Sequence, residues 1–145
     1  MEPLDHELAQ RVWQRVQGAA PEDPIPQMLV LMHSCAEGCG RLKRHFTSRE
    51  TELQRMRTGL LRQGACLQGI YYLRTGQQLS PPAQAAESTH TLLRRCIGDT
   101  LRLAESLRRA ASDIEYGPVF AAMAEKMTEY TQLLLELAGK VSRSS

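Results

Sequence analysis

The sequence predicts an all-α protein in which four long helices form an antiparallel bundle and a short accessory helix precedes them. Three observations lead to this prediction. Apolar residues recur three and four positions apart, which places them on one face of a helix. The alternation with a period of two that indicates β-strands is absent from the sequence. Capping residues, prolines and glycines separate stretches of helical length.

The first predicted element is a short accessory helix at residues 5–17, within an N-terminal region that covers residues 1–20. Gly18 ends this helix, and the prolines between residues 21 and 26 indicate a linker, because proline removes a backbone donor and interrupts a helix. Proline fits the first turn of a helix, so the linker leads directly into the next element. The apolar face of the accessory helix consists of Leu8, Val12, Trp13 and Val16.

A bundle domain is predicted at residues 25–139, and its first helix extends to about Phe46. Residues 47–50 have the pattern of a capping box, in which a hydroxyl and a glutamate three positions later satisfy backbone donors at a helix start. The second helix then runs to about Arg74. It ends at Gly76, since glycine readily adopts the left-handed conformation that closes a helix.

The second half of the bundle is predicted from similar signals. Ser80 and the two prolines after it mark the start of the third helix, which ends near Ala111. The fourth helix ends at Gly139, and residues 140–145 form a polar, disordered tail. Because the connections within each half are short, each half is an antiparallel helix hairpin. The longer connection that begins at Gly76 crosses an end of the bundle.

Length, charge and apolar content limit the functions that the chain can have. Its 145 residues suit one domain, and a net charge of +2 with few aromatic residues gives no indication of nucleic-acid binding. The longest apolar run, Met28–Met32, has five residues, whereas a membrane-spanning helix needs about 20. The acidic first residues do not resemble a signal peptide. We therefore expect a cytoplasmic protein whose cysteines are reduced thiols and which binds no membrane.

Two stretches of the sequence indicate a family. Residues 67–76 read LQGIYYLRTG, and residues 113–125 read DIEYGPVFAAMAE. They resemble the end of the second bundle helix and the entry to the last helix in rubrerythrin-like members of the ferritin-like superfamily. A weaker similarity extends over residues 25–139. The resemblance implies a ferritin-like antiparallel four-helix bundle, which in that family surrounds a di-iron site.

The ligand positions that this resemblance implies hold few residues that bind metals. Ferritin-like di-iron proteins place a Glu on the first and third helices and Glu-x-x-His on the second and fourth. The matching positions are His33 (or Met32) on the first helix, Leu60 and Gln63 on the second, Thr100 on the third, and Met127 and Tyr130 on the fourth. Leucine and methionine cannot neutralise two divalent ions, so we expect them to be core residues. Gln63, Thr100 and Tyr130 are expected to form a buried, hydrogen-bonded remnant of the site.

Two other sets of residues offer metal ligands. His33 and Glu37 are four positions apart, which places them on one helix face as a residual site. Four cysteines lie at or near inward positions, where thiolates suit a soft ion such as Cu(I) or Zn(II). The competing interpretation is that they are small core side chains. These cysteines are Cys35, Cys39, Cys66 and Cys96.

The sequence therefore predicts a non-catalytic ferritin-like bundle that has lost its di-iron ligands and serves as a structural or protein-interaction module. No catalytic residue and no cofactor are expected. The predicted partner is a second copy of the chain, bound through the accessory helix with Trp13. The alternative is a metal-binding or redox protein of the rubrerythrin class, which holds iron, zinc or copper through His33 and Glu37 or through the cysteines.

Overall fold

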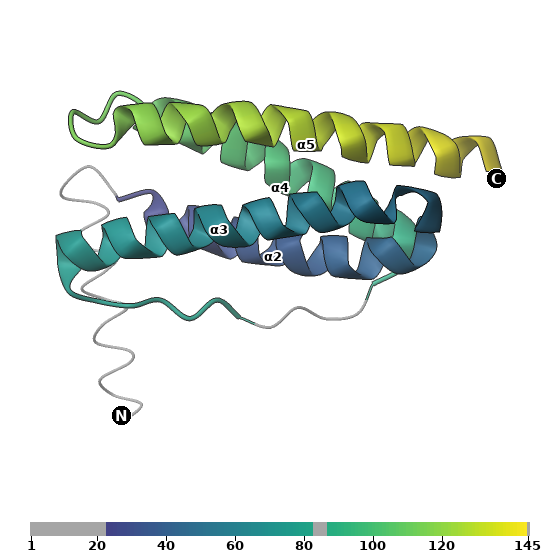
Figure 1. The fold of residues 1–145 in the computed structure, drawn as a ribbon, viewed down its shortest axis with the longest axis horizontal. Helices are drawn as coiled ribbons and strands as arrows, with labels where there is room; N and C mark the ends of the chain where they lie inside the picture. The colour runs from purple at the N-terminus through teal and green to yellow at the C-terminus, as the bar shows by residue number, and fades with distance from the viewer. Residues whose placement is uncertain (1–22, 83–86, 145) are drawn as a thin grey trace.

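The computed structural model describes residues 23–82 and 87–144, and these residues form four long helices and one short 3-10 turn without any strand (Figure 1). The prediction of an all-α protein is confirmed. The predicted accessory helix at residues 5–17 lies outside the described residues. No helix in the described part of the chain is both long enough and apolar enough to cross a membrane. The elements are α2 (Ile25–His45), η1 (Thr47–Arg49), α3 (Glu50–Thr75), α4 (Thr89–Ala110) and α5 (Gly117–Ser144).

Two helix hairpins, α2 with α3 and α4 with α5, are joined by a connection that runs back along the bundle (Figure 1). The Gln68 amide holds this connection against α3, because it donates to the Leu79 carbonyl at 2.6 Å and accepts from the Leu79 amide at 3.2 Å. The connection reaches α4 at the other end of the bundle, where Glu87 lies 3.8 Å from Arg41 near the end of α2. As a result, α3 and α4 run in the same direction, and the connection follows the length of the bundle rather than one end.

Helix α2 is the central element of the core. From Met28 to Leu42 none of its residues is exposed, because α3 packs on one side of it and α4 on another. Helix α5 packs closely against α4, whereas the backbones of α3 and α5 seldom approach each other. Leucine, methionine and cysteine side chains fill the interior. The bundle is therefore closely packed around α2 and more open between α3 and α5.

The predicted capping box at the start of α3 is wrong. Residues 47–49 form a 3-10 turn, and α3 begins at Glu50 without a side-chain cap. Backbone bonds close the turn instead, since the amide of Arg49 donates to the carbonyl of Phe46 at 2.9 Å. The Arg49 guanidinium then bonds Glu52 at 2.5 Å and reaches Glu136 on α5 at 2.8 Å. This turn thus ties the start of α3 to the far part of α5.

Helix α3 ends at Gly76 as predicted, and this glycine has a φ of 72°.

The start of α4 differs from the prediction, because the helix begins at Thr89 rather than near Ser80. Its true cap is Ser88, whose hydroxyl accepts from the amide of Thr91 at 3.3 Å. The prolines that suggested a helix start belong to the long connection, whose length is fixed by the bundle that it must follow.

The predicted end of α5 at Gly139 is also wrong. The helix continues to Ser144, so residues 140–144 of the predicted tail are helical. Gly139 does not have the positive φ that ends a helix at Gly76. A glycine inside a helix costs about 1 kcal/mol relative to alanine, which weakens a helix but does not by itself end it.

Candidate functional site

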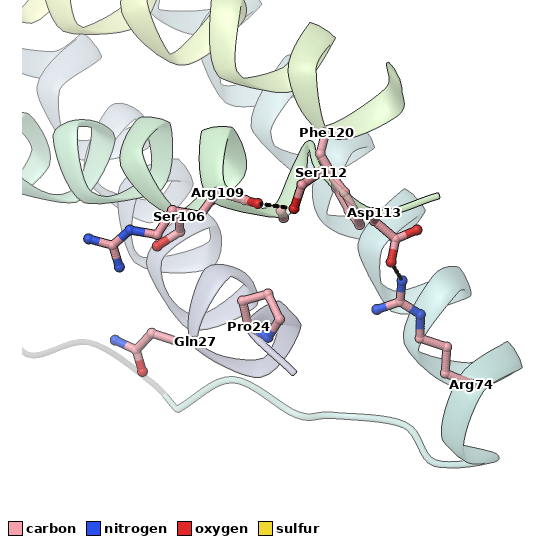
Figure 2. A pocket seen from close by; sticks show the side chains of 9 residues that line it. Pro24, Gln27, Arg74, Ser106, Arg109, Ser112, Asp113 and Phe120 are labelled. Atoms are coloured by element: carbon pink, nitrogen blue, oxygen red, sulfur yellow. Dashed lines mark hydrogen bonds and ion pairs between the residues drawn. The ribbon is translucent and has the colours of Figure 1, made fainter. Parts of the chain in front are cut away.

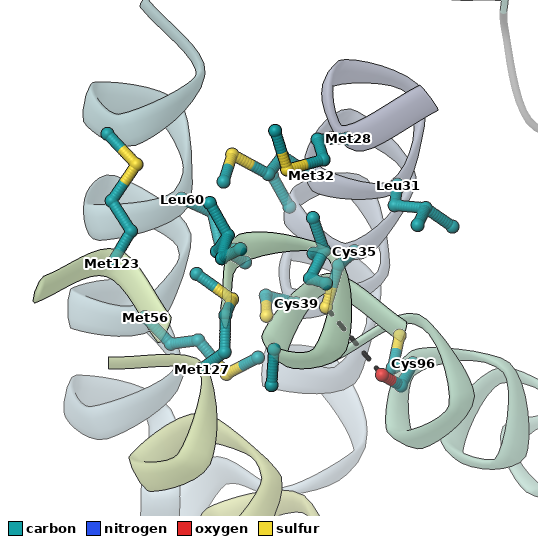
Figure 3. Close-up of a cluster of buried hydrophobic side chains, with 14 of the residues drawn as sticks. Met28, Leu31, Met32, Cys35, Cys39, Met56, Leu60, Cys96, Met123 and Met127 are labelled. Carbon is teal, nitrogen blue, oxygen red and sulfur yellow. Dashed lines mark hydrogen bonds between the residues drawn. The ribbon is translucent and has the colours of Figure 1, made fainter. Parts of the chain in front are cut away.

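Two of the four predicted ligand positions on α3 and α5, Leu60 and Met127, are part of the hydrophobic core. Leu60 is 1% exposed and Met127 is completely buried. Figure 3 shows both side chains among Met56, Met32 and the cysteines of α2, in the space between the helices. Leucine and methionine carry no charged donor, and methionine in particular fills irregular gaps in a core. The centre of the bundle is therefore closed by apolar side chains at two positions where the sequence resemblance predicted metal ligands.

The predicted hydrogen-bonded remnant of Gln63, Thr100 and Tyr130 does not form. Thr100 is buried and bonds Thr131 instead, with 2.8 Å between the two hydroxyl oxygens. Its own hydroxyl donates to the carbonyl of Ile97 at 3.0 Å, so both of its polar functions are satisfied within α4 and α5. The prediction failed because Thr131, one position after Tyr130, is the residue that faces Thr100.

Gln63 and Tyr130 lie at the edge of the core, between α3 and α5. The Oε1 atom of Gln63 is buried and has no hydrogen-bond partner in the described residues. Tyr130 is partly buried, which raises the pKa of its phenol, and its ring packs over Gly59, where an added Cβ would come within 3.3 Å of the ring carbon Cζ. Glycine at this position therefore allows Tyr130 to lie against the backbone of α3.

His33 and Glu37 do form the predicted pair, but they lie on the outer side of α2. His33 Nε2 is 3.2 Å from Glu37 Oε1, and the side chains are 35% and 36% exposed. The inward residue of this turn is Met32, which is 1% exposed. His33 lines a shallow apolar hollow between α2 and α3, beside Pro81 of the long connection. The pair is thus separate from the centre of the bundle.

The four cysteines do not form one cluster. Cys35, Cys39 and Cys96 are buried, whereas Cys66 is exposed on α3, because its neighbour Leu67 takes the inward position. The Cys35 thiol contacts the carbonyl of Cys96 at 4.0 Å. Hydrogen bonds with Cys39 and Cys96, together with burial, raise the pKa of Cys35 well above its usual value. Cys35, Cys39 and Cys96 are therefore packed as core side chains.

No group of three or more His, Cys, Asp or Glu side chains in residues 23–82 and 87–144 is placed so that it could hold a metal ion. The three buried thiols therefore do not form such a group, and the His33–Glu37 pair has no third ligand of these types placed beside it in the described residues. The described residues therefore contain no candidate metal centre with three or more ligands of these types.

Thiol reactivity should distinguish Cys66 from the other cysteines. We expect one thiol per chain to react quickly with an aromatic disulfide reagent, because Cys66 alone is exposed and the other three are buried. The raised pKa of Cys35 also lowers its thiolate fraction, and the thiolate is the reacting species. The Cys66→Ser variant should lose the fast phase and release its three thiols only on unfolding. A fast phase that persists in this variant would show that the buried thiols are accessible.

A buried polar network between α2 and α4 escaped prediction. Asp99 is 4% exposed and accepts a hydrogen bond from the Ser34 hydroxyl at 3.1 Å. Arg95 lies 3.3 Å from Asp99 and binds Glu87 at 2.7 Å with its Nε atom. Burial raises the pKa of Asp99, while Ser34 and Arg95 oppose that shift. The sequence of α4 could have indicated this buried carboxylate, because Asp99 follows the inward Cys96 by three positions and so lies on the same helix face.

A second polar joint lies at the end of the bundle where α2 begins and α3 ends. Arg74 forms ion pairs with Asp113 at 2.7 Å and with Asp23 at 3.6 Å, and it stacks over the ring of Tyr116 at 5.4 Å. Backbone amides of Tyr116 and Glu115, with Arg74, lower the pKa of Asp113. An open cleft of about 560 Å³ lies beside these contacts, and Figure 2 shows the side chains that line it. Arg74 already pairs with two carboxylates, so these contacts connect the end of α3 to the segment before α2 and to the turn before α5.

The chain matches no protein-family model, no curated protein and no solved structure.

Proposed function

We propose that the protein is a non-catalytic four-helix bundle of the ferritin-like type that serves as a structural or protein-interaction module. Two helix hairpins joined by one long connection along the bundle are the connectivity expected of ferritin-like folds. Buried Leu60 and Met127 at the ligand positions of that family support a bundle without di-iron chemistry. The cytoplasmic location remains a prediction from the sequence.

The observation that carries the interaction role is a set of exposed apolar side chains at one end of the bundle. Leu73 in the last turn of α3 is 75% exposed, Ile114 in the turn before α5 is fully exposed, and Val119 in the first turn of α5 is partly exposed. The Arg74–Asp113 ion pair joins the segments that carry Leu73 and Ile114. We refer to Leu73, Ile114 and Val119 as the bundle-end patch. Contiguous exposed apolar patches mark interaction sites in soluble proteins, and we propose that these three side chains form one.

A second copy of the chain is the partner that we propose for the bundle-end patch. A two-fold axis places the same patch of both copies face to face, so the patch must complement itself. Apolar side chains meet this condition.

Sedimentation equilibrium of the full chain tests this proposal. We expect a dimer for the natural sequence and a monomer for the double variant Leu73→Ser/Ile114→Ser. The matched control is Leu135→Ser, because Leu135 is also an exposed leucine on α5 but lies outside the patch. It should leave the dimer intact. A natural chain that is monomeric at all concentrations, or a control that dissociates as much as the patch variant, would overturn the proposal.

A further inference from the structure

The two helices whose backbones seldom approach, α3 and α5, border a groove. Two open hollows of about 580 and 590 Å³ lie along it and share Gln63 and Lys126 as lining residues. Gly59, Met123 and Tyr130 also line it. We call this feature the α3–α5 groove. Apolar side chains such as Val119 and Met123 line it together with polar and charged ones, and Gln63, whose buried Oε1 atom has no hydrogen-bond partner in the described residues, is among them.

The charges along the α3–α5 groove differ between its two ends. Arg55 and Arg62 line one end, where none of the described lining residues is a carboxylate, whereas Lys126 lines both hollows and pairs with Glu129 at 3.3 Å. Glu125 and Glu129 line the other hollow, which opens beside Val119 at the end of the bundle where α5 begins. An occupant that fits this pattern carries acidic residues at one end and basic residues at the other.

The chain enters the described structure at the same end of the bundle. Asp23 pairs with Arg74, which also holds Asp113 just before α5. The five residues 18–22 can span at most about 17 Å when extended. A helix over residues 5–17 would be about 20 Å long, and the groove from Pro118 to Tyr130 follows about 18 Å of α5. The segment before Asp23 therefore has the reach and the length to lie along the groove.

We propose that residues 5–17 of the same chain, which lie outside the described residues, occupy the α3–α5 groove. Their predicted apolar face, which includes Trp13, would cover Met123 and Tyr130. Because the chain enters at the end of the bundle where Arg74 joins Asp23 and Asp113, residue 17 lies at that end. Asp5 and Glu7 then reach the basic end of the groove, and Arg11 and Arg15 lie near its acidic end. The sequence order of charges in the segment matches the order along the groove, and the proposal does not depend on the dimer.

Energy transfer between two natural residues tests this inference. Trp13 is the single tryptophan of the chain, and Cys66 is its exposed thiol, three positions from Gln63 on α3. A naphthalene dye on Cys66 of the full chain should accept energy from Trp13 when the segment is docked. The Ala122→Arg variant places a long cation in the groove and should abolish transfer, with a red shift of Trp13 emission. Ala121→Arg is the matched control, because Ala121 is exposed on α5 but does not line the groove.

We expect transfer in the natural chain and in Ala121→Arg, and its loss in Ala122→Arg with unchanged helical circular dichroism. A natural chain without transfer and with solvent-like Trp13 emission would overturn the proposal. Equal transfer in both arginine variants would also overturn it, because the segment would then dock elsewhere. Energy transfer that occurs only between two copies, from Trp13 of an unlabelled natural copy to the dye on a labelled Trp13→Phe copy, would overturn docking within one chain. That result would show that the segment docks on a second copy. The bundle-end variants Leu73→Ser/Ile114→Ser should keep the transfer, so a failed dimer test leaves this result intact.

Discussion

Leu60→Ala is expected to lower the free energy of unfolding by about 2–5 kcal/mol, as is typical of a buried leucine truncated to alanine. Leu60 is 1% exposed and packs in the centre of the bundle. Its truncation removes apolar contacts and leaves a cavity that the neighbouring helices can close only in part. Denaturant unfolding monitored by circular dichroism measures the loss.

The adjacent Leu61→Ala is the matched control. Leu61 is the next residue on the same helix but is 42% exposed, so its truncation should change the free energy of unfolding by no more than about 0.5 kcal/mol. If the two variants are equally stable, Leu60 is not packed core, and the interpretation of the bundle centre is wrong.

Arg95→Met is expected to lower the free energy of unfolding by about 3 kcal/mol at neutral pH. This value is the lower end of the range that is typical when one partner of a buried ion pair is removed. The variant leaves Asp99 buried without the guanidinium that lies 3.3 Å away. It also releases Glu87, which Arg95 binds at 2.7 Å. Arg94→Met, at the exposed neighbouring position, is the control and should have little effect.

The loss of unfolding free energy in the Arg95→Met variant should depend on pH. Burial raises the pKa of Asp99 in the folded protein above its value in the unfolded chain, and removal of Arg95 raises this pKa further. The folded state then binds a proton more tightly than the unfolded state, so stability falls as the pH rises through the raised pKa. The deficit of the variant should therefore be largest at neutral pH and shrink in acid. Adding Asp99→Asn should restore part of the loss, and a deficit that is independent of pH would exclude Asp99 as its cause.

The helical fold could be predicted because the apolar periodicity of each helix is strong. The ends of α2 and α3 lie within about one residue of their predicted positions, since Pro24, Pro26 and Gly76 act locally on the backbone. The start of α4 could not be predicted in this way. Its position depends on how far the connection must run along the bundle, a property of the assembled helices rather than of the residues near Ser80.

The candidate site was predictable as a set of helix faces but not as individual contacts. The apolar pattern fixes which residue of a helix points inward only to within one position. The structure shows that Met32 rather than His33 points inward, and that Thr131 rather than Tyr130 contacts Thr100. The same small rotation separates exposed Cys66 from buried Leu67.

The polar network was missed for a different reason. Ser34 and Asp99 are 65 positions apart in the sequence and meet only when α2 packs on α4.

The metal content of the natural protein tests the central proposal most directly, namely that this is a bundle of the ferritin-like type in which core residues such as Leu60 and Met127 stand at the di-iron ligand positions. The full chain would be produced in iron-supplemented cells, purified without chelators and analysed for iron, zinc and copper by mass spectrometry. We expect far less than one ion of any of these metals per chain, and no change in thermal stability when a chelator is added. About two iron ions per chain would contradict the claim, and stoichiometric copper or zinc that is lost in Cys35→Ala would instead favour binding by the buried thiols.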